Sequence, residues 1–360
     1  MRGFPAFQRI AYGAAWGVAF FAPHFMWLYV LLLSKSHATV VQATLLYVCI
    51  VCYASALSGI MFLLFRWLGF VLSASAFFLF ATKYSLWFWG RWEGYPFINP
   101  LVPLAKYKWF LCVYGFACSL FFPGRQPVAL DDYKICYIQP TYKAGQRPNL
   151  HAVGQGIYHA LCNLELETFS DAYKDLIVVA PESAFPFCLN KQKKYVRMWG
   201  AVLPGNSHFF IGAHRRKKEG STKKYFQSVF WLHRGLIMQA YDKKHLVPFV
   251  ETMPVKWNTY AWAHGLFLKD VYAFSTPCDC VDDNLFRVAE HLCVAPKICS
   301  ELFFCSERVL EQANLVLLFV NDSWFMGYIK DIMRSLAQLA AAQRGVPVVY
   351  VAHSGCDVLT

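Results

Sequence analysis

Three groups that can do chemistry stand at the ends of apolar runs in the second half of the sequence. Glu182 follows the run LIVVAP, the cluster Lys243-Lys244-His245 precedes the apolar LVPF, and Cys299 lies within KICSE. A thiol must lose its proton before it attacks. A carboxylate in a partly apolar pocket can act as the general base, and an ammonium beside them stabilises a thiolate and a developing oxyanion. The combination indicates nucleophilic chemistry without a metal, although thirteen cysteines leave other nucleophiles open.

The elements that would position these groups alternate between strand and helix from about residue 131 onward. The helices expected are 153–173 and 331–344, and the strands expected are 134–139, 176–180, 208–213, 228–232, 315–320 and 346–351. Most of these strands are continuous apolar runs, which is typical of strands buried on both faces. The pattern predicts a layered α/β domain, in which polar residues at strand ends mark the site.

The first third of the chain has a different composition. Only 16% of all residues are charged, against about 25% in a typical soluble domain, and residues 10–33 and 39–65 contain no charged residue. Each of these runs can cross a bilayer core, which needs about 20 helical residues. Residues 67–89 and 109–122 are weaker candidates. The sequence therefore predicts about four membrane spans in residues 1–125, followed by a soluble-type domain in 131–360, while basic residues in nearly every connection leave the orientation open.

One loop between two predicted strands carries a large part of the net charge of +12. The loop carries Arg215, Arg216, Lys217, Lys218, Lys223 and Lys224. It is interpreted either as a solvated hairpin tip or as a contact with anionic lipid headgroups. No interleaved aromatic platform indicates nucleic acid, and the lone C-x-C at 278–280 lacks the second half of a metal site. Neither a metal nor a cofactor is expected.

Four motifs in a fixed order connect the three groups to a known family. They are APESAFP at 180–186, YDKKHLVPFVE at 241–251, ICSE at 298–301 and NDSWF at 321–325. Together they resemble the carbon–nitrogen hydrolase (nitrilase) superfamily, and more closely its membrane-bound branch, the apolipoprotein N-acyltransferases. The stretch AWGVAFFAPHFMWLYVLL at 15–32 is similar to a membrane helix of that branch. The resemblance implies a multi-pass helical membrane region followed by a nitrilase-like α-β-β-α sandwich.

The resemblance also implies roles for individual residues. Glu182 matches the general base and Cys299 the nucleophile. Lys243 matches the catalytic lysine, because the family pattern is Tyr-x-Lys-x-His-Leu. Glu251 and Glu301 match supporting glutamates. Trp324 and Phe325 are candidates to line the entrance for the acyl chain, with ordinary packing as the alternative.

The reaction implied is acyl transfer in two steps through a cysteine thioester. A phospholipid is the donor, and the acceptor is the N-terminal amine of a diacylglyceryl-cysteine lipoprotein. Both substrates are anchored in lipid, so the resemblance implies a protein of the bacterial inner membrane with its catalytic domain on the outer, periplasmic side.

The sequence departs from the family pattern at several points. Ser300 stands where a tyrosine usually follows the nucleophile, and Val250 stands where a glycine precedes the second glutamate. The first two membrane helices, the last strands and a C-terminal helix of the family are expected to be missing. Two other functions therefore stay open: a membrane-tethered amidase or nitrilase-type hydrolase that uses water as acceptor, and an inactive remnant.

Other residues near these motifs are assigned to structure. Lys244 and His245 are expected to support the loop, and Asn321 and Asp322 to brace another. Glu251 is interpreted either as a partner of the lysine or as an ordinary loop carboxylate. A buried cysteine of the core is the alternative for Cys299.

Overall fold

The structure is a computed structural model that describes thirteen stretches of the chain and falls into two compact units. The described residues are 6–35, 39–56, 58–60, 133–140, 148–164, 175–246, 251, 274–275, 285–290, 292–299, 301, 312–324 and 327–359. The first unit contains the N-terminal helices together with Glu251, and the second contains all of the described strands. The domain boundaries expected from the sequence, 1–125 and 131–360, stay a prediction.

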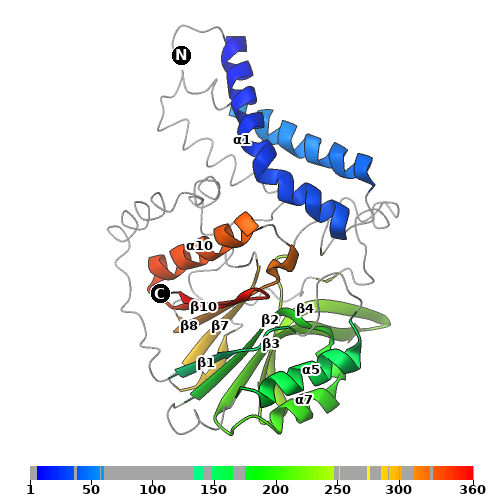
Figure 1. The fold of residues 1–360 in the computed structure, drawn as a ribbon, viewed down its shortest axis with the longest axis vertical. Helices are drawn as coiled ribbons and strands as arrows, with labels where there is room; N and C mark the ends of the chain where they lie inside the picture. Colours follow the sequence, from blue (N-terminus) through cyan, green and yellow to red (C-terminus); the bar gives the residue numbers. More distant parts are fainter. Residues whose placement is uncertain are drawn as a thin grey trace. The chain divides into compact units, whose positions relative to one another are not determined.

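Two sheets of five strands form the second unit (Figure 1). The first has the order β1-β2-β3-β4-β5, with β1, β2 and β3 parallel and β3, β4 and β5 antiparallel. Its strands are β1 (Tyr133–Tyr137), β2 (Asp175–Cys188), β3 (Ser207–Glu219), β4 (Thr222–His233) and β5 (Leu236–Asp242). Because β1 and β2 are parallel, their carboxyl ends lie at the same edge of the sheet.

The second sheet has a parallel centre with an antiparallel strand on each side. Its order is β10-β9-β8-β7-β6, and β7, β8 and β9 are parallel. Its strands are β6 (Phe286–Ala289), β7 (Leu292–Ile298), β8 (Leu315–Val320), β9 (Val348–Ala352) and β10 (Gly355–Leu359). Residues that follow β7, β8 and β9 therefore gather at one edge.

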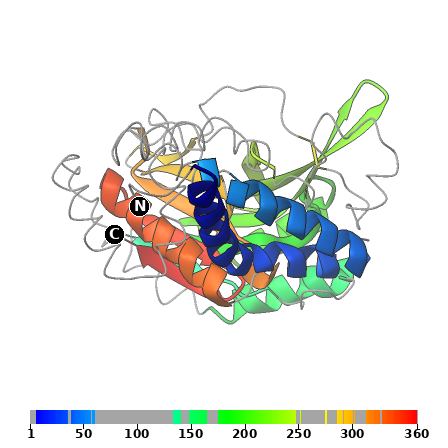
Figure 2. The same cartoon turned by 90° about the horizontal axis from the view of Figure 1, so that it is seen from above.

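The two sheets pack face to face, and helices cover their outer sides. Strand β2 contacts β8 and β9, and β4 contacts β7. Stacked rings of Phe210 and Phe286, 5.9 Å apart, fill part of the interface. Helices α5 (Leu150–Cys162) and α7 (Lys193–Gly200) cover the first sheet, and α10 (Gly327–Arg344) runs along the second (Figures 1 and 2). The expected α-β-β-α arrangement is present in the described part of the chain.

The predicted elements occur with shifted ends. The six expected strands correspond to β1, β2, β3, β4, β8 and β9. The helix expected at 153–173 begins earlier, at Leu150, and ends at Cys162. The prediction is therefore wrong for residues 163 and 164, which form a turn, and residues 165–173 lie outside the described residues. The side chain of Asn149 starts this helix, since its Oδ1 accepts hydrogen bonds from the backbone N–H groups of His151 at 2.9 Å and Ala152 at 3.1 Å.

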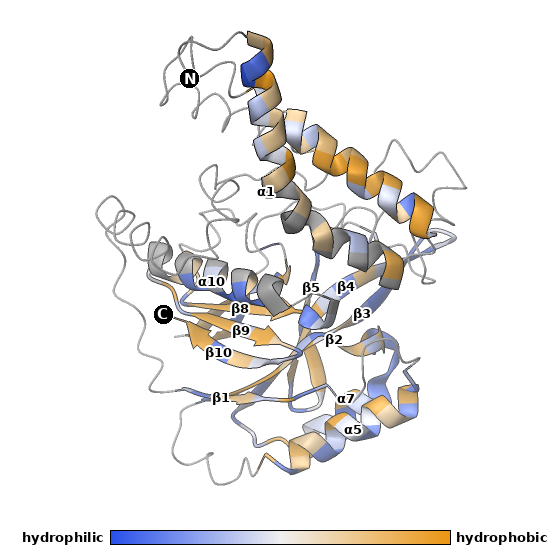
Figure 3. Ribbon diagram, turned by 45° about the horizontal axis from the view of Figure 1, so that its top comes forward, coloured by the Kyte–Doolittle hydropathy of each residue, from blue (hydrophilic) through white to orange (hydrophobic). Residues whose placement is uncertain are grey.

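The first unit contains a pair of closely packed helices, α1 (Ala6–Lys35) and the helix Val40–Ile60. A Cβ on Gly17 would lie 2.6 Å from the Cα of Ser55, so small residues set the crossing. Among the described residues, Val40–Ile60 is the helix that is long and apolar enough to span a membrane, with a mean hydropathy of 2.0 (Figure 3). The weaker runs 67–89 and 109–122 lie outside the described residues, and the number of spans stays a prediction.

One buried histidine in the first sheet is held neutral by its neighbours. The Nδ1 atom of His208 accepts a hydrogen bond from the indole N–H of Trp231 at 3.3 Å. Its Nε2 atom therefore carries the proton and lies 3.4 Å from Asp175. Burial and, to a smaller extent, His233 lower the pKa of His208 to about 4, although Asp175 opposes the shift. Burial also lowers the pKa of His214 to about 4.

We predict that these histidines make the fold sensitive to acid. Because their pKa values are lower in the folded chain than in the unfolded chain, the stability they contribute is present above about pH 6.5 and is lost as the pH falls toward 4. Each contributes on the order of 3 kcal/mol to this loss. Thermal unfolding of the purified protein in detergent between pH 7.5 and 4.5 measures it.

The variant His208→Asn keeps an acceptor for Trp231 and removes one titrating group, so its stability should depend less on pH. His159→Asn changes an exposed histidine and serves as the control. An equal pH dependence in all three proteins would contradict the prediction.

Candidate active site

Glu182 lies in an irregular stretch of β2. The ladder between β2 and β3 pairs Ala180 with Ile211, and resumes at Phe185 with Ala213. Three more residues of β2 than of β3 therefore lie between these pairs, and Ser183 takes a positive φ of 56°. A bulge of this kind bends the strand and re-aims side chains. Here it directs Glu182, which is only 4% exposed, out of the ordinary ladder.

The facing residue of β3 is a glycine for a steric reason. A Cβ on Gly212 would lie 2.3 Å from the carbonyl oxygen of Pro181 and 2.6 Å from the Cα of Glu182. Real Cβ atoms do not approach backbone atoms so closely. The bulge that carries Glu182 therefore requires glycine at position 212.

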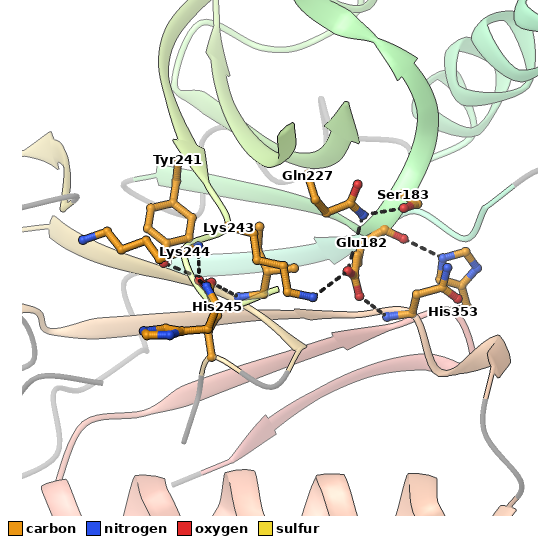
Figure 4. A network of polar contacts seen from close by, with 11 residues as sticks. Glu182, Ser183, Gln227, Tyr241, Lys243, Lys244, His245 and His353 are labelled. Carbon is orange, nitrogen blue, oxygen red and sulfur yellow. Dashed lines mark hydrogen bonds and ion pairs between the residues drawn. The ribbon is translucent and has the colours of Figure 1, made fainter. Parts of the chain in front are cut away.

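The carboxylate of Glu182 is held from several sides (Figure 4). Its Oε1 atom accepts from the ammonium of Lys243 at 3.4 Å and from the amide of Gln227 at 3.3 Å. Its Oε2 atom accepts from the backbone N–H of Asn321 at 2.8 Å. The orientation of this carboxylate is thus fixed by β4, by the residue after β5 and by the residue after β8.

The backbone of Glu182 is held by a histidine of the opposite sheet. The Nε2–H group of His353, directly after β9, donates to the carbonyl oxygen of Glu182 at 2.7 Å (Figure 4). Burial lowers the pKa of His353, while this hydrogen bond and Asp322 oppose the shift. The contact requires a proton on Nε2, and the lowered pKa favours the neutral ring.

Lys243 follows the last residue of β5 and is almost fully buried. It is 1% exposed, and its backbone N–H donates to the carbonyl of Gln227 at 2.8 Å. Gln227 therefore contacts both members of the pair, Lys243 through its backbone and Glu182 through its side chain. A buried ammonium needs a charged or strongly polar partner, which the carboxylate of Glu182 supplies.

Cys299 directly follows β7 and is 8% exposed. Its φ of 53° is rare for a residue with a side chain, and such strain at a strand end is often associated with function. Because β7, β8 and β9 are parallel and adjacent, Cys299 leaves the sheet at the same edge as Asn321 and His353. Both of these residues contact Glu182, so the topology brings Cys299 toward the same region.

A second buried carboxylate, that of Glu301, connects the segment after β5 to the end of β7. Oε1 of Glu301 accepts from the backbone N–H groups of Lys244 at 2.5 Å and His245 at 3.2 Å. Its Oε2 atom accepts from the hydroxyl of Tyr241 at 3.0 Å and from the backbone N–H of Ile298 at 3.0 Å. Glu301 thus ties the segment after Lys243 to the residue before Cys299.

Comparisons with known proteins agree with the motifs. The chain is 28% identical over 257 residues to an apolipoprotein N-acyltransferase of Rhizobium leguminosarum, covering 68% of this chain and 47% of that protein. It is 24% identical over 249 residues to the enzyme of Brucella suis, covering 66% and 46%, and 30% identical over 189 residues to that of Rhizobium rhizogenes, covering 50% and 34%. The chain is a relative of the apolipoprotein N-acyltransferases. It spans about half the length of the curated relatives it matches, and no family model matches it.

Solved structures give a weaker likeness. A CN-hydrolase superfamily protein from Xanthomonas campestris has a TM-score of 0.39 and 16% identity, covering 61% of this chain and 74% of that one. A glutamine-dependent NAD+ synthetase from Acinetobacter baumannii also has a TM-score of 0.39, with 13% identity, covering 60% and 38%. The relationship to the N-acyltransferases rests on the sequence relatives.

The other residues that the sequence predicts at the candidate site are Glu251, Trp324 and Phe325. Glu251 is 3% exposed and belongs to the first unit, so its role stays a prediction. Trp324 ends the short helix η4 (Asp322–Trp324), and Phe325 lies outside the described residues. Their proposed place along the acyl entrance stays a prediction as well.

The expected supporting residues do hold loops together. Lys244 and His245 bind Glu301 through their backbones. Asp322 accepts from the backbone N–H of Ser354 at 3.2 Å and pairs with Lys330 at 3.5 Å. Asn321, expected only as a brace, also donates its backbone N–H to Glu182.

Sequence reasoning missed Gln227 and His353. A signal was present for both, because each is a polar residue beside an apolar run, FQSVFWL for the first and VVYVAHSG for the second. Among the described residues, no group of three or more His, Cys, Asp or Glu side chains is arranged to hold a metal ion.

The close approach at Gly212 leads to a prediction about stability. Gly212→Ala forces β2 and β3 apart at the bulge, and overpacking of this kind costs about 1–3 kcal/mol. Thermal or denaturant unfolding in detergent measures the loss. Gly205→Ala is the matched control, since a Cβ there would meet only the far end of Arg234 at 3.9 Å. Equal stability of both variants would show that the bulge does not depend on glycine.

The four contacts of Glu301 lead to a second prediction. Glu301→Gln keeps the shape but removes the charge and turns an amide N–H₂ group toward N–H donors, so stability should fall by about 1.5–3 kcal/mol. Glu219→Gln removes a carboxylate whose side chain is 46% exposed and should change stability by less than about 1 kcal/mol. Unfolding midpoints of the two variants decide whether the buried carboxylate ties the strands together.

Proposed function

We propose that this chain is an acyltransferase that moves a fatty acyl chain from a phospholipid to the N-terminal amine of a diacylglyceryl-cysteine lipoprotein. Cys299 is the nucleophile, Glu182 the general base and Lys243 the cation that stabilises negative charge. The observation that supports this best is the buried pair of Lys243 and Glu182, 3.4 Å apart, at the edge where β7 delivers Cys299.

In the first half-reaction, Glu182 takes the proton of the Cys299 thiol. The thiolate sulfur bonds to the carbonyl carbon of the phospholipid ester, and the charge that develops on the carbonyl oxygen is stabilised by the Lys243 ammonium. The ester C–O bond then breaks, and Glu182 returns the proton to the departing alkoxide of the lysophospholipid. The acyl chain remains on Cys299 as a thioester.

In the second half-reaction, the α-amine of the lipoprotein bonds to the thioester carbon. Glu182 takes a proton from the attacking nitrogen, and Lys243 again faces the oxyanion. The C–S bond breaks, the sulfur recovers the proton, and an amide forms. No oxidant or energy source is required, because a thioester is more reactive than the amide product.

The lipid nature of both substrates suits a chain that combines this site with the apolar helix Val40–Ile60. The proposed partners are therefore a phospholipid donor, a lipoprotein acceptor and the membrane itself. The proposed place is the bacterial inner membrane, with the catalytic domain on the periplasmic side, where lipoproteins are matured.

Trapping the acyl-enzyme tests the proposal. Membranes that contain the chain are incubated with a phospholipid bearing an alkyne-tagged acyl chain, and the protein is examined for a label that neutral hydroxylamine removes. We expect the label on the wild type and none on Cys299→Ala. Cys293→Ala, in the strand β7 that precedes Cys299, is the matched control and should label normally. Glu182→Gln should label about 10²–10⁴-fold more slowly.

The acceptor is tested by adding a diacylated lipopeptide with a free or an acetylated α-amine. N-acylated product from the free amine alone supports the transferase. Release of fatty acid without N-acylation would favour the hydrolase, and the absence of any label on the wild type would favour an inactive remnant. Normal labelling of Cys299→Ala would overturn the assignment of the nucleophile.

A further inference from the structure

The two faces of the long hairpin formed by β3 and β4 differ in how their basic residues are paired with carboxylates. Its strands pair without a register shift from Phe209–Leu232 to Glu219–Thr222, and its end extends past the rest of the sheet (Figure 2). Because neighbouring residues of a strand point to opposite faces, the basic residues near its end divide into two sets. Figure 3 shows this end as hydrophilic.

On one face, every basic residue has a carboxylate partner. Arg215 and Lys217 lie 3.0 Å and 2.9 Å from the buried carboxylate of Asp242. Lys224 lies 2.5 Å from Glu219. Two carboxylates thus offset most of the charge of the three cations on this face, and Lys217 also lies over the ring of Phe226, 5.1 Å from its centre.

The opposite face is not balanced. It carries Arg216, Lys218 and Lys223, and within the described part of the chain none of the three forms an ion pair with a carboxylate. Lys218 and Lys223 are exposed and stand directly opposite each other in the ladder. Like charges in this position destabilise a strand pair, so an anion bound between them would relieve a repulsion that the fold leaves in place.

This unbalanced face is continuous with the candidate active site. Lys223, Tyr225 and Gln227 alternate along β4 and therefore share one face, and Gln227 contacts the carboxylate of Glu182. Gln227 lies four positions after Lys223, which corresponds to about 13 Å along a strand. An anionic surface at Lys218 and Lys223 would thus lie close to the site without entering it.

We propose that this face, consisting of Arg216, Lys218 and Lys223, docks on the anionic phospholipid headgroups of the membrane. Three cations without a carboxylate partner among the described residues match a surface of negative charge, and the helix Val40–Ile60 of the same chain is suited to a membrane. The inference rests on the proposed function in one respect, because it assumes that the catalytic unit works at the bilayer surface. Each basic residue near an anionic surface should favour the docked state about fivefold.

The test measures contact with headgroups independently of acyl transfer. A fluorescent amino acid is placed at Ser221, in the exposed turn of the hairpin, in the full-length chain. The protein is reconstituted into nanodiscs of phosphatidylcholine alone or with about three parts in ten of phosphatidylglycerol. Both contain a phosphatidylcholine with a nitroxide on its headgroup, which quenches fluorophores at the surface.

We expect stronger quenching in the anionic nanodiscs than in the neutral ones. The double variant Lys218→Gln, Lys223→Gln should lower the ratio of docked to undocked hairpin by about 25-fold and bring quenching to the level in neutral lipid. Lys193→Gln, Lys194→Gln removes the same charge from exposed positions of α7 and should quench like the wild type. High salt should abolish the difference.

Two results would overturn the inference. One is equal quenching in neutral and anionic nanodiscs, and the other is quenching that the Lys218 and Lys223 changes leave intact. Loss of quenching on addition of millimolar inorganic phosphate would instead assign the face to a free anion. If quenching follows the lysines while no thioester forms at Cys299, the docking surface stands and the proposed function fails.

Discussion

The buried ion pair of Lys243 and Glu182 is the interaction on which the candidate site depends. The two side chains are 1% and 5% exposed, and their charged atoms lie 3.4 Å apart. Removing one partner of such a pair typically destabilises a protein by about 3–5 kcal/mol, because the other charge is left buried. Replacing both partners by apolar side chains is often neutral or stabilising. Stability alone therefore gives no reason to keep the pair, which agrees with the charge-stabilising role that we propose for Lys243.

The fold keeps this pair in place by tying together segments that are distant in the sequence. Glu182 receives donors from Gln227 in β4, from Asn321 after β8 and from His353 after β9. Glu301 connects the backbone after Lys243 with the last residue of β7. The two carboxylates thus differ in role because their partners differ. Glu301 binds backbone N–H groups and a tyrosine hydroxyl in a structural connection, while Glu182 faces an ammonium at the edge of the sheets.

Apolar runs in the sequence predict the central strands well, but not the geometry that produces the site. LIVVA and LVLLFV correspond to β2 and β8, since a strand buried on both faces leaves a continuous apolar signal. The run LIVVA stops at Pro181, so the sequence gives no sign that β2 continues through a bulge to Cys188. That bulge is created by pairing with β3 and by the missing side chain of Gly212, both of which depend on tertiary contacts.

The sequence pattern of β7 and β5, the strands that lead to Cys299 and Lys243, does not predict a strand clearly. Strand β7, LCVAPKI, contains Pro296 and Lys297, which seldom occur inside a strand, and β5, LIMQAYD, has a mixed pattern because its first residues are exposed. The choice of Lys243 over Lys244 came from the family motif, and the ion pair with Glu182 is consistent with it.

The alternation of side chains along β4 places a residue of the candidate site and a residue of the basic hairpin end on the same face of the strand. Its inner part places Gln227 against Glu182, and its outer part places Lys223 on the same face beside Lys218. A shift of the ladder by one residue would exchange the faces, turning Gln227 away from the carboxylate and bringing Lys223 to the side of Asp242 and Glu219. The ladder that positions the carboxylate therefore also decides which basic residues of the hairpin face away from Asp242 and Glu219, so the geometry of the site and the charge of the hairpin surface are set by the same register.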